Sequence, residues 1–320
     1  MEQRRVIAKS TSCLNTHAVR AKVVRNILAA LAGREDLETL VPGLTLIQRR
    51  QPVPPTSYLY SPSLAVIVQG SKNIVLGNSS YHYDESQFLL TAVNLPTITE
   101  VAEASPERPY VSIMLKLDLA VAKQIITDAD LEEAPAAPGS AMAVGPATPQ
   151  LFDALARLVN LLATPADIPI LGDLIQREIL YRVLTGPTGS RLRQIVRIGT
   201  QSNRVARAVI WLRENYQAPL RVEELAELSN MGLSTLHHHF RLMTSMSPLQ
   251  FQKHLRLHEA RRLLLSEEMD AGSAALAVGY ESATQFSREY RRLFGAPPAR
   301  DVRTLRLTHT AGLAEQDEVV

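Results

Sequence analysis

Two stretches toward the C-terminal end of the chain repeat one pattern. LAELSNMGLSTLHHHF at 225–240 and AALAVGYESATQFSREY at 274–290 each predict a short helix, a turn and a second helix. A small residue in the first helix lets the two helices cross closely, and a large apolar pair four residues apart anchors the second. This pattern predicts two helix-turn-helix units, each with a polar helix face free to enter a DNA major groove. The corresponding positions are Ala226 and Ala275, Leu236 and Phe286, and Phe240 and Tyr290.

Helix start and stop signals surround both units. Ser247 and Pro248 open a long connecting helix, because serine is a good N-cap and proline at the first helical position has no amide to leave unpaired. Ser282 is expected to cap the last helix, and Gly295 to end it. The helices predicted for this region cover residues 203–216, 222–229, 233–243, 248–265, 271–278 and 282–294.

The first half of the chain has a different texture. Between residues 44 and 118, short β-branched or aromatic runs alternate with turn residues, which predicts an antiparallel sandwich or small barrel. The clearest runs are at 64–68, 73–76, 88–93 and 110–117. Around them we expect helices at 17–32, 151–163 and 171–184, a Pro/Ala/Gly-rich loop at 134–149, and a linker beginning with GPTGSR at 186–191. The sequence therefore predicts an α+β chain with an all-α C-terminal part.

Charge is unevenly distributed along the 320 residues. Residues 191–308 contain 18 Lys and Arg, of which 17 are arginine, against 11 Asp and Glu; the remainder contains 16 basic and 21 acidic residues. An arginine-rich half beside an acidic half indicates that the second half meets a polyanion. The composition, 46% hydrophobic and 21% charged, is that of a globular protein, and the length favours two domains.

Targeting signals and cysteine content indicate the cellular compartment of the protein. We find no run of about 18 apolar residues and therefore expect no membrane-spanning helix. The first residues, MEQRRVIAKSTSCLNTHAV, lack the apolar core of a secretory signal. The single cysteine, Cys13, excludes an intramolecular disulfide; it is either a spare thiol in a loose N-terminal arm or a reactive sensor. These features predict a cytoplasmic protein.

Several longer stretches carry a family resemblance. LRLHEARRLL at 255–264, VGYESATQFSREYRRLFGAPP at 278–298 and the start of the connecting helix at Pro248 make residues 200–306 resemble the DNA-binding domain of AraC/XylS-family transcriptional regulators. Residues 44–130, with YSPSLAVIVQGSKNIVLG, YHYDESQ and EASPERPY, resemble the AraC-type N-terminal domain of one subgroup. The resemblance covers most of the chain.

This resemblance implies an architecture and a set of partners. It implies a cupin-like β-domain followed by helices that dimerise, in an effector-responsive bacterial regulator without enzymatic activity or cofactor. Its partners would be double-stranded promoter DNA, a small-molecule effector, a second copy of the chain and, for an activator, RNA polymerase. In the subgroup it resembles, neighbouring genes often encode oxidoreductases for alcohols or aldehydes, which suggests such an effector. The implied division is an N-terminal effector-binding and dimerisation domain at 1–186, a linker at 187–199, a DNA-binding domain at 200–306 and a tail at 307–320.

Three consecutive histidines lie on the second helix of the first unit. Because successive helical residues point about 100° apart, His237, His238 and His239 cannot converge on one metal ion. His239 shares a face with the apolar anchor pair and is expected to pack on the core. His237 and His238 then lie with Ser234 on the outer face, where the resemblance places contacts to bases or phosphates. The alternative is that they only touch the phosphate backbone.

The second unit offers stronger base readers. Arg288 is the best candidate, because a guanidinium can bind guanine O6 and N7 with two hydrogen bonds; Gln285 could read adenine similarly. A phosphate contact is the alternative for Arg288, and the arginines that follow it are expected to hold the backbone. The candidate contacts on this helix are Ala283, Thr284, Gln285, Arg288, Arg291 and Arg292.

Other histidines raise the question of a metal site. His254 and His258 have the i, i+4 spacing of zinc ligands, but no glutamate follows His254, so we expect surface residues of the connecting helix. In the β-region His82 stands alone where metal cupins carry paired histidines, and one imidazole cannot form a facial site. A metal-free effector pocket fits better. His82, Tyr83 and Tyr58 are candidate polar contacts in it, or satisfied structural side chains.

Three functions compete at this point. A sequence-specific transcription regulator is the leading hypothesis. A cupin-type enzyme with an appended helical domain would need a metal ion. A protein-interaction module built on the helical repeat is disfavoured by the arginine excess of residues 191–308.

Overall fold

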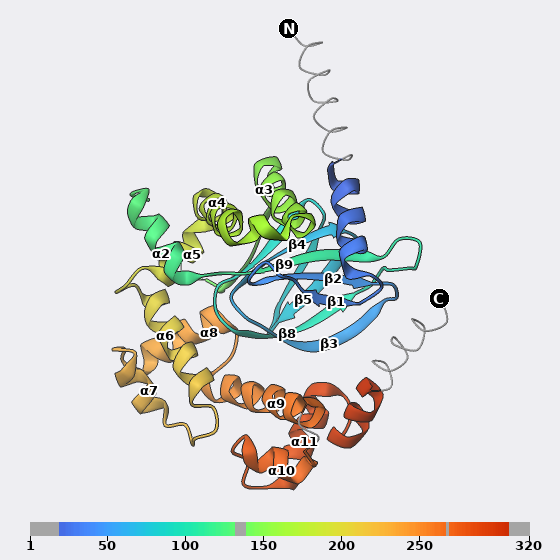
Figure 1. The fold of residues 1–320 in the computed structure, drawn as a ribbon. Helices are drawn as coiled ribbons and strands as arrows, with labels where there is room; N and C mark the ends of the chain where they lie inside the picture. Colours follow the sequence, from blue (N-terminus) through green and yellow to red (C-terminus); the bar gives the residue numbers. More distant parts are fainter. Residues whose placement is uncertain (1–18, 132–138, 267–268, 307–320) are drawn as a thin grey trace.

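The fold is that of a computed structural model, which describes residues 19–131, 139–266 and 269–306. Two antiparallel sheets form a β-domain, and helices from the second half of the chain curve around one side of it and beneath it (Figure 1). This α+β architecture confirms the predicted fold class. Cys13 and the tail at 307–320 lie outside the described residues.

The larger sheet has the strand order β1-β2-β9-β4-β7-β10. Its strands are β1 (Asp36–Glu38), β2 (Leu44–Arg49), β4 (Ser63–Gln69), β7 (Gln87–Thr91), β9 (Tyr110–Lys116) and β10 (Met142–Pro146). Strand β4 is buried on both faces, because one face points to the second sheet and the other is covered by helices (Figure 1). This double burial explains its uninterrupted apolar run.

Strand β10 corrects one prediction. The segment 134–149 was expected to be a loop throughout, but its end pairs antiparallel with β7, with Ala143 opposite Leu90 and Val144 opposite Leu89. Backbone pairing to an existing strand overrides the weak β propensity of an alanine- and glycine-rich segment. Gly145 suits this place, since a Cβ there would come within 2.7 Å of the Phe88 ring.

The smaller sheet has the order β3-β8-β5-β6 and faces the larger one. Its strands are β3 (Val53–Tyr60), β5 (Ser71–Leu76), β6 (Ser79–Asp84) and β8 (Leu95–Val101). Strands β5 and β6 form a hairpin in which Lys72 is opposite Tyr83 and Ile74 is opposite Tyr81. Apolar side chains from both sheets fill most of the space between them.

Helices that precede residue 200 cover the outer face of the larger sheet. A helix at residues 19–31 and α3 lie against it (Figure 1). Asp118 and Thr148 cap α2 and α3, each accepting from backbone amides of the first turn. The labelled elements are α2 (Leu119–Asp128), α3 (Pro149–Asn160), η1 (Leu161–Ala163), η2 (Pro165–Asp167), η3 (Ile168–Gly172), α4 (Asp173–Thr185) and α5 (Gly189–Val196).

Two predictions from the sequence, the linker and the lack of a membrane-spanning helix, can be compared with these helices. Helix α5 occupies much of the segment predicted as a linker, and its Leu192 and Ile195 are buried. Among the described residues, no single helix is long and apolar enough to cross a membrane. The stretches Pro149–Ala163 and Pro165–Thr185 pass that test only as a pair bent by 118°, and by length and composition alone.

The C-terminal helices confirm the predicted succession. They are α6 (Gln201–Glu214), α7 (Val222–Leu228), α8 (Leu233–Thr244), α9 (Pro248–Ser266), α10 (Ala271–Ala277) and α11 (Ala283–Phe294), followed by helical residues at 298–306. Helix α9 belongs to two apolar clusters. Phe251 and Leu255 join the cluster shared with the β-domain, whereas Leu257, Ala260 and Leu264 join a second cluster around α10 and α11.

Candidate functional site

The first helix-turn-helix unit consists of α7 and α8. Ala226 is buried between the two helices, and Leu236 and Phe240 are fully buried beneath α8. Gly232 occupies the N-cap position, where it offers no side-chain hydrogen bond. The outer face of α8 therefore stays clear of the core. Ser234, His237 and His238, the predicted contacts on this unit, are all exposed on it.

The histidine run follows the helix geometry. His239 is half-buried beside the core, and burial, followed by the neighbouring His238, lowers the pKa of its imidazole. The His238 and His239 rings meet edge to face at 5.1 Å. Within the part of the chain that the structure describes, no group of three metal-ligating side chains gathers, here or elsewhere. The run therefore presents two imidazoles outward and one toward the core.

The second unit, α10 and α11, is anchored more firmly. Ser282 caps α11, because its hydroxyl accepts from the Gln285 amide at 3.3 Å. Beneath α11, the Asp301 carboxylate accepts two hydrogen bonds from Arg261, at 2.8 and 2.9 Å, and one from the Tyr290 hydroxyl at 2.8 Å. This network ties α9 and α11 to the helical residues at 298–306.

The side chains predicted to contact DNA from α11 are all exposed in the structure. The Gln285 amide reaches Glu289 Oε1 at 3.3 Å and must leave that partner to read a base. Arg288 has no such partner among the hydrogen bonds and ion pairs of the described residues. The guanidinium at that position is thus free to bind an anionic or acceptor-rich surface. The exposed candidates are Ala283, Thr284, Gln285, Arg288, Arg291 and Arg292.

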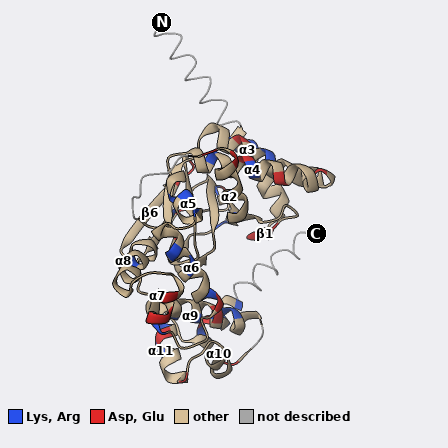
Figure 2. Ribbon diagram, turned by 90° about the vertical axis from the view of Figure 1, so that its left-hand side faces the viewer, with Lys and Arg blue, Asp and Glu red and all other residues tan. Residues whose placement is uncertain are grey.

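Charge is patterned over the helical region. Figure 2 shows acidic side chains gathered on α7, whose first turn contains Glu223 and Glu224, with basic side chains on α6 nearby. Two arginines, Arg291 and Arg292, lie in the last turn of α11, where a cation also complements the helix dipole. The positive charge described here therefore lies on α6 and on the last turn of α11.

A cavity of about 360 Å³ lies between the two sheets. Tyr58 and Tyr83, two of the three predicted effector contacts, line it, whereas His82 is exposed and bonds Asn73 Oδ1 through Nδ1 at 2.7 Å. Sequence reasoning missed Lys72, although the alternation of β5 places it on the same face as the buried Ile74. The full lining is Asp36, Glu38, Thr45, Ile47, Arg49, Val53, Thr56, Tyr58, Tyr60, Ala65, Lys72, Tyr83, Thr99, Val101, Tyr110, Ser112 and Met114.

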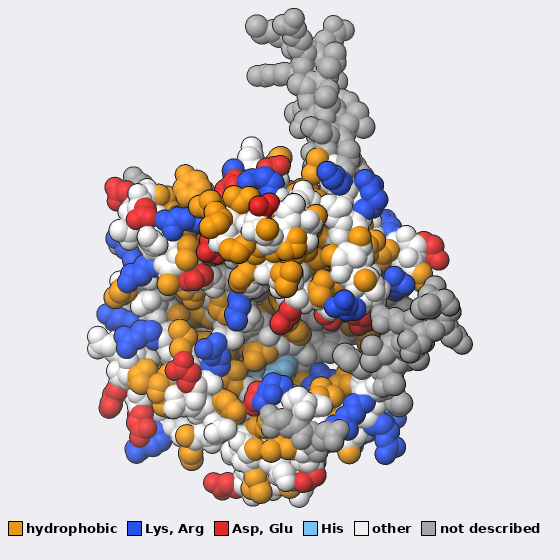
Figure 3. Space-filling view, viewed as in Figure 1, with side chains coloured by type: hydrophobic (Ala, Val, Ile, Leu, Met, Phe, Trp, Pro, Cys, Tyr) orange, Lys and Arg blue, Asp and Glu red, His pale blue; other side chains and the backbone are white. Residues whose placement is uncertain are grey.

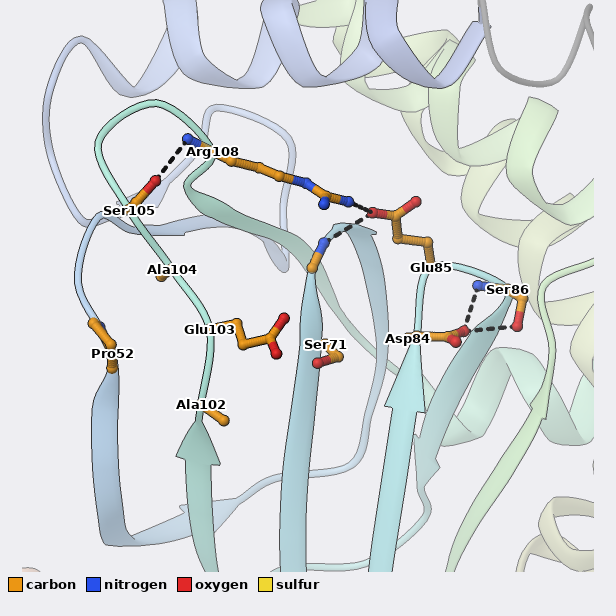
Figure 4. Close-up of a pocket in the computed structure, with 11 residues that line it drawn as sticks. Pro52, Ser71, Asp84, Glu85, Ser86, Ala102, Glu103, Ala104, Ser105 and Arg108 are labelled. Atoms are coloured by element: carbon orange, nitrogen blue, oxygen red, sulfur yellow. Dashed lines mark hydrogen bonds and ion pairs between the residues drawn. The ribbon is translucent and has the colours of Figure 1, made fainter.

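A second, larger hollow of about 730 Å³ opens at the ends of β5, β6 and β8 (Figure 4). Its polar groups largely satisfy one another. Glu85 accepts from the Gly70 amide at 3.0 Å and pairs with Arg108 at 3.5 Å, and Asp84 accepts from the Ser86 amide and hydroxyl. We therefore consider this hollow part of the structural rim of the β-domain.

Family models match the sequences of both the β-domain and the helical region, and curated proteins match part of the chain. A model described as "AraC-type transcriptional regulator N-terminus" matches residues 40–191, and one described as "Helix-turn-helix domain" matches residues 225–304. CdhR of Pseudomonas aeruginosa is 30% identical over 126 residues, which are 39% of this chain and 38% of CdhR. ExsA of the same species is 30% identical over 155 residues, 48% of this chain and 55% of ExsA. The chain belongs to the AraC/XylS family.

Other relatives extend the comparison within the family. The activator RhaS of Pectobacterium carotovorum is 31% identical over 100 residues, 31% of this chain and 36% of RhaS. The matches to CdhR, ExsA and RhaS thus span between about a third and just over half of those proteins. ToxT of Vibrio cholerae O395, solved with (E)-4-(8-methylnaphthalen-1-yl)but-3-enoic acid bound, has a TM-score of 0.55 at 12% identity, over 81% of this chain and 99% of ToxT. A further ToxT structure gives 0.50 at 11% identity, over 80% and 96%. ToxT therefore shares the fold.

In this AraC/XylS-family protein, the connecting helix α9 docks on the β-domain. It contacts β3 and β8 and lies beneath them in Figure 1, and the face seen in Figure 3 is hollowed between the two parts, with a histidine visible there. His258 Nε2 lies 3.1 Å from Ser57 Oγ on β3. Burial, then the positive charges of His254 and Arg261, lowers the His258 pKa to about 3. The prediction of solvent-facing residues was wrong for His254 and His258, because the helix face that carries them packs against another domain.

The first helix-turn-helix unit is also held by the β-domain. The Gly77 turn of the β5–β6 hairpin abuts the end of α8, and a Cβ on Gly77 would lie 2.5 Å from Ser245 Cβ. The Ala141 amide donates to the Met243 carbonyl at 3.0 Å. Helix α8 is therefore connected to the β-domain through short, specific contacts.

Proposed function

We propose that this protein is a bacterial transcription regulator that binds promoter DNA sequence-specifically through its two helix-turn-helix units. One observation carries the proposal. Two such units stand in tandem around α9, each with a buried apolar anchor and an exposed polar face on its second helix. Such units can enter successive major grooves about one helical turn apart on one side of the duplex. The arginine excess of this region supplies the attraction to phosphate.

The β-domain is the proposed sensor. Its cavity is large enough for a small molecule and is lined by apolar and aromatic side chains together with hydroxyl and charged groups. ToxT, which has the same fold, was solved with a small organic acid bound, and this supports a small-molecule effector. An alcohol or aldehyde is the class that the sequence resemblance suggests. A regulator that binds promoter DNA would act in the bacterial cytoplasm.

Strand β3 would transmit the signal. Thr56, Tyr58 and Tyr60 line the cavity, whereas Ser57, on the opposite face, bonds His258 of α9. A ligand that shifts the cavity face of β3 therefore also shifts the surface on which α9 docks. Because α9 joins the two units, their spacing on DNA would change with cavity occupancy.

Activation is the proposed direction of regulation. RhaS is named a transcriptional activator, and its similarity to this chain supports that direction, with RNA polymerase as the partner. A homodimer through α3 and α4 would place two pairs of units on one promoter. Apolar side chains remain uncovered where η3 meets α4, since Ile170 of η3 and Leu174 of α4 are 69% and 60% exposed.

A genomic DNA pull-down with the purified full chain tests the proposal, repeated with Arg288→Ala and His238→Ala. We expect one short asymmetric sequence to be enriched, and the two variants to relax it at different base positions. Arg288→Ala should cost about 1–3 kcal/mol on the preferred site. Arg25→Ala, an exposed arginine on the helix at 19–31, serves as the control and should leave enrichment unchanged.

One result would contradict the proposal, and a second would change the role given to Arg288. Enrichment of no sequence would show that the helical region does not read DNA. An equal loss on all sequences with Arg288→Ala would show that this residue is a phosphate clamp and not a base reader.

A further inference from the structure

The cavity between the sheets contains one amine, that of Lys72. Its Nζ donates a hydrogen bond to the Tyr60 hydroxyl at 3.0 Å and lies 5.6 Å from the centre of that ring. Tyr83, opposite Lys72 in the β5–β6 register, is fully buried, and among the described residues its hydroxyl has no hydrogen-bond partner. Lys72 itself is half-buried and lines the cavity.

No carboxylate neutralises this amine. Within the described parts of the chain, no Asp or Glu oxygen lies within 4.0 Å of Lys72 Nζ. Burial lowers the pKa of Lys72, because a charged amine there loses its hydration, and the more distant Asp36 carboxylate offsets this loss only in part. A larger share of Lys72 is therefore the neutral, nucleophilic amine than for a lysine in water. Lysines made reactive by burial are those that form Schiff bases in proteins.

The remaining charges of the cavity select against an anionic ligand. Asp36 and Glu38 line it and are exposed, so two carboxylates stand where the cavity meets solvent. Arg49, the other cation in the lining, is already bound by Asp36 through two hydrogen bonds of 3.1 and 3.0 Å. A ligand carboxylate would pass the Glu38 carboxylate and an Asp36–Arg49 pair that is already neutralised, to reach one desolvated amine. A neutral molecule that bonds to the amine avoids both costs.

We propose that Lys72 captures a small aldehyde as a reversible imine and is thus the covalent effector-binding residue of the β-domain. The inference rests on the proposed function and adds the reacting atom and the functional group. The Nζ lone pair forms a C–N bond to the carbonyl carbon, and one N–H proton passes to the carbonyl oxygen. The resulting carbinolamine loses its hydroxyl with the second N–H proton as water. No oxidant or reductant is required, and hydrolysis returns the free lysine and the aldehyde.

Tyr60 is the positioning residue for this step. Its hydroxyl accepts from Nζ and so lies where the first proton leaves the nitrogen. Tyr60 is on β3, the strand whose other face bonds α9 through Ser57. Imine formation would replace the Lys72–Tyr60 hydrogen bond and release Tyr60. An alcohol of the same skeleton has no electrophilic carbon, so the site would respond to the aldehyde and ignore the alcohol.

The test uses three probes with one skeleton: benzaldehyde, benzyl alcohol and benzoate. The full chain is incubated with each near neutral pH, reduced with sodium cyanoborohydride and mapped by peptide mass spectrometry. We expect one benzyl group on Lys72, formed about tenfold or more faster than on Lys123, an exposed lysine on α2. Lys72→Arg keeps the cation but has no nucleophilic amine and should lose the adduct. Lys123→Arg is the matched control and should keep it.

Thermal shift and DNA binding separate the remaining outcomes. Benzaldehyde should raise the melting temperature of the wild type and not that of Lys72→Arg or Lys72→Met. Stabilisation by benzoate or benzyl alcohol without an adduct at Lys72 would overturn the imine while leaving the cavity as an effector site. An adduct at Lys72 that leaves promoter binding unchanged would uphold the imine and contradict the proposed regulation. No adduct and no stabilisation by any probe would overturn the imine and the cavity's sensing role together.

Discussion

At the scale of single residues, exposure on the reading helices follows from periodicity. Once Phe286 and Tyr290 are assigned to the core, the 3.6-residue repeat alone places Arg288 on the outside. The same reasoning failed for His254 and His258. Helical periodicity shows that these two share a face, but not whether that face meets water or another domain. The contact with β3 is made by residues about 200 positions apart, and local sequence carries no signal for it.

His258 should make the docked state sensitive to acid. Burial first, then His254 and Arg261, lowers its pKa to about 3, so the folded protein keeps this imidazole neutral while the unfolded chain takes up a proton below about pH 6.5. Stability therefore falls as the pH drops from about 6.5 toward 3, by at most about 1.4 kcal/mol per pH unit. Urea unfolding between pH 7 and 5 measures this slope.

Two variants isolate the contribution of His258 to that slope. His258→Gln cannot titrate and should reduce the slope, while His254, whose pKa is also lowered by burial, keeps part of it. His237→Gln, an exposed histidine on α8, should leave it as in the wild type. Equal slopes for the wild type and His258→Gln would show that the acid sensitivity arises elsewhere.

At the scale of elements, sequence patterns predicted most helices and the strongest strands. Ser282 and Gly295 marked the ends of α11 because capping is a local property of the backbone. The strand β10 was missed, since its pairing with β7 depends on a partner some 50 residues away. Lys72 was missed for a related reason. A polar residue at the start of a strand is usually exposed, and only the enclosed cavity makes this one distinctive.

The β5–β6 turn should control the first reading helix. Gly77 has a φ of +57° and sits against Ser245 at the end of α8, so Gly77→Ala adds a left-handed strain of about 1–2 kcal/mol and a close contact that pushes α8 away. We expect faster hydrogen exchange in α8 and weaker promoter binding. Gly199→Ala is the matched control, because Gly199 has a φ of +91° but no atom within 4 Å of its added Cβ. A similar effect of both substitutions would show that backbone strain, not the contact with α8, is responsible.

At the scale of the whole molecule, an apolar surface remains around α3 and α4. Figure 3 shows hydrophobic side chains gathered over these helices. Ile170, Leu171 and Leu174 are 69%, 41% and 60% exposed, and Tyr181 of α4 is 46% exposed. Contiguous exposed apolar side chains of this kind mark interaction surfaces. We predict that this apolar surface forms the interface of a homodimer.

Leu174→Glu should separate the dimer into monomers, because a carboxylate would have to be buried against a second apolar surface. Sedimentation velocity at micromolar concentration measures the outcome. Leu276→Glu places the same charge at a leucine that is 70% exposed on α10, and it should leave the dimer intact. A wild-type protein that sediments as a monomer would contradict the dimer itself.

Strand β3 gives these observations a genetic consequence. Within one eight-residue segment, Thr56, Tyr58 and Tyr60 face the cavity while Ser57 between them bonds the connecting helix, so the two faces cannot drift independently of each other. A selection for regulators that stay on without an inducer, or that never switch on, should therefore return substitutions crowded into residues 53–60. Many of them would touch neither the effector nor DNA.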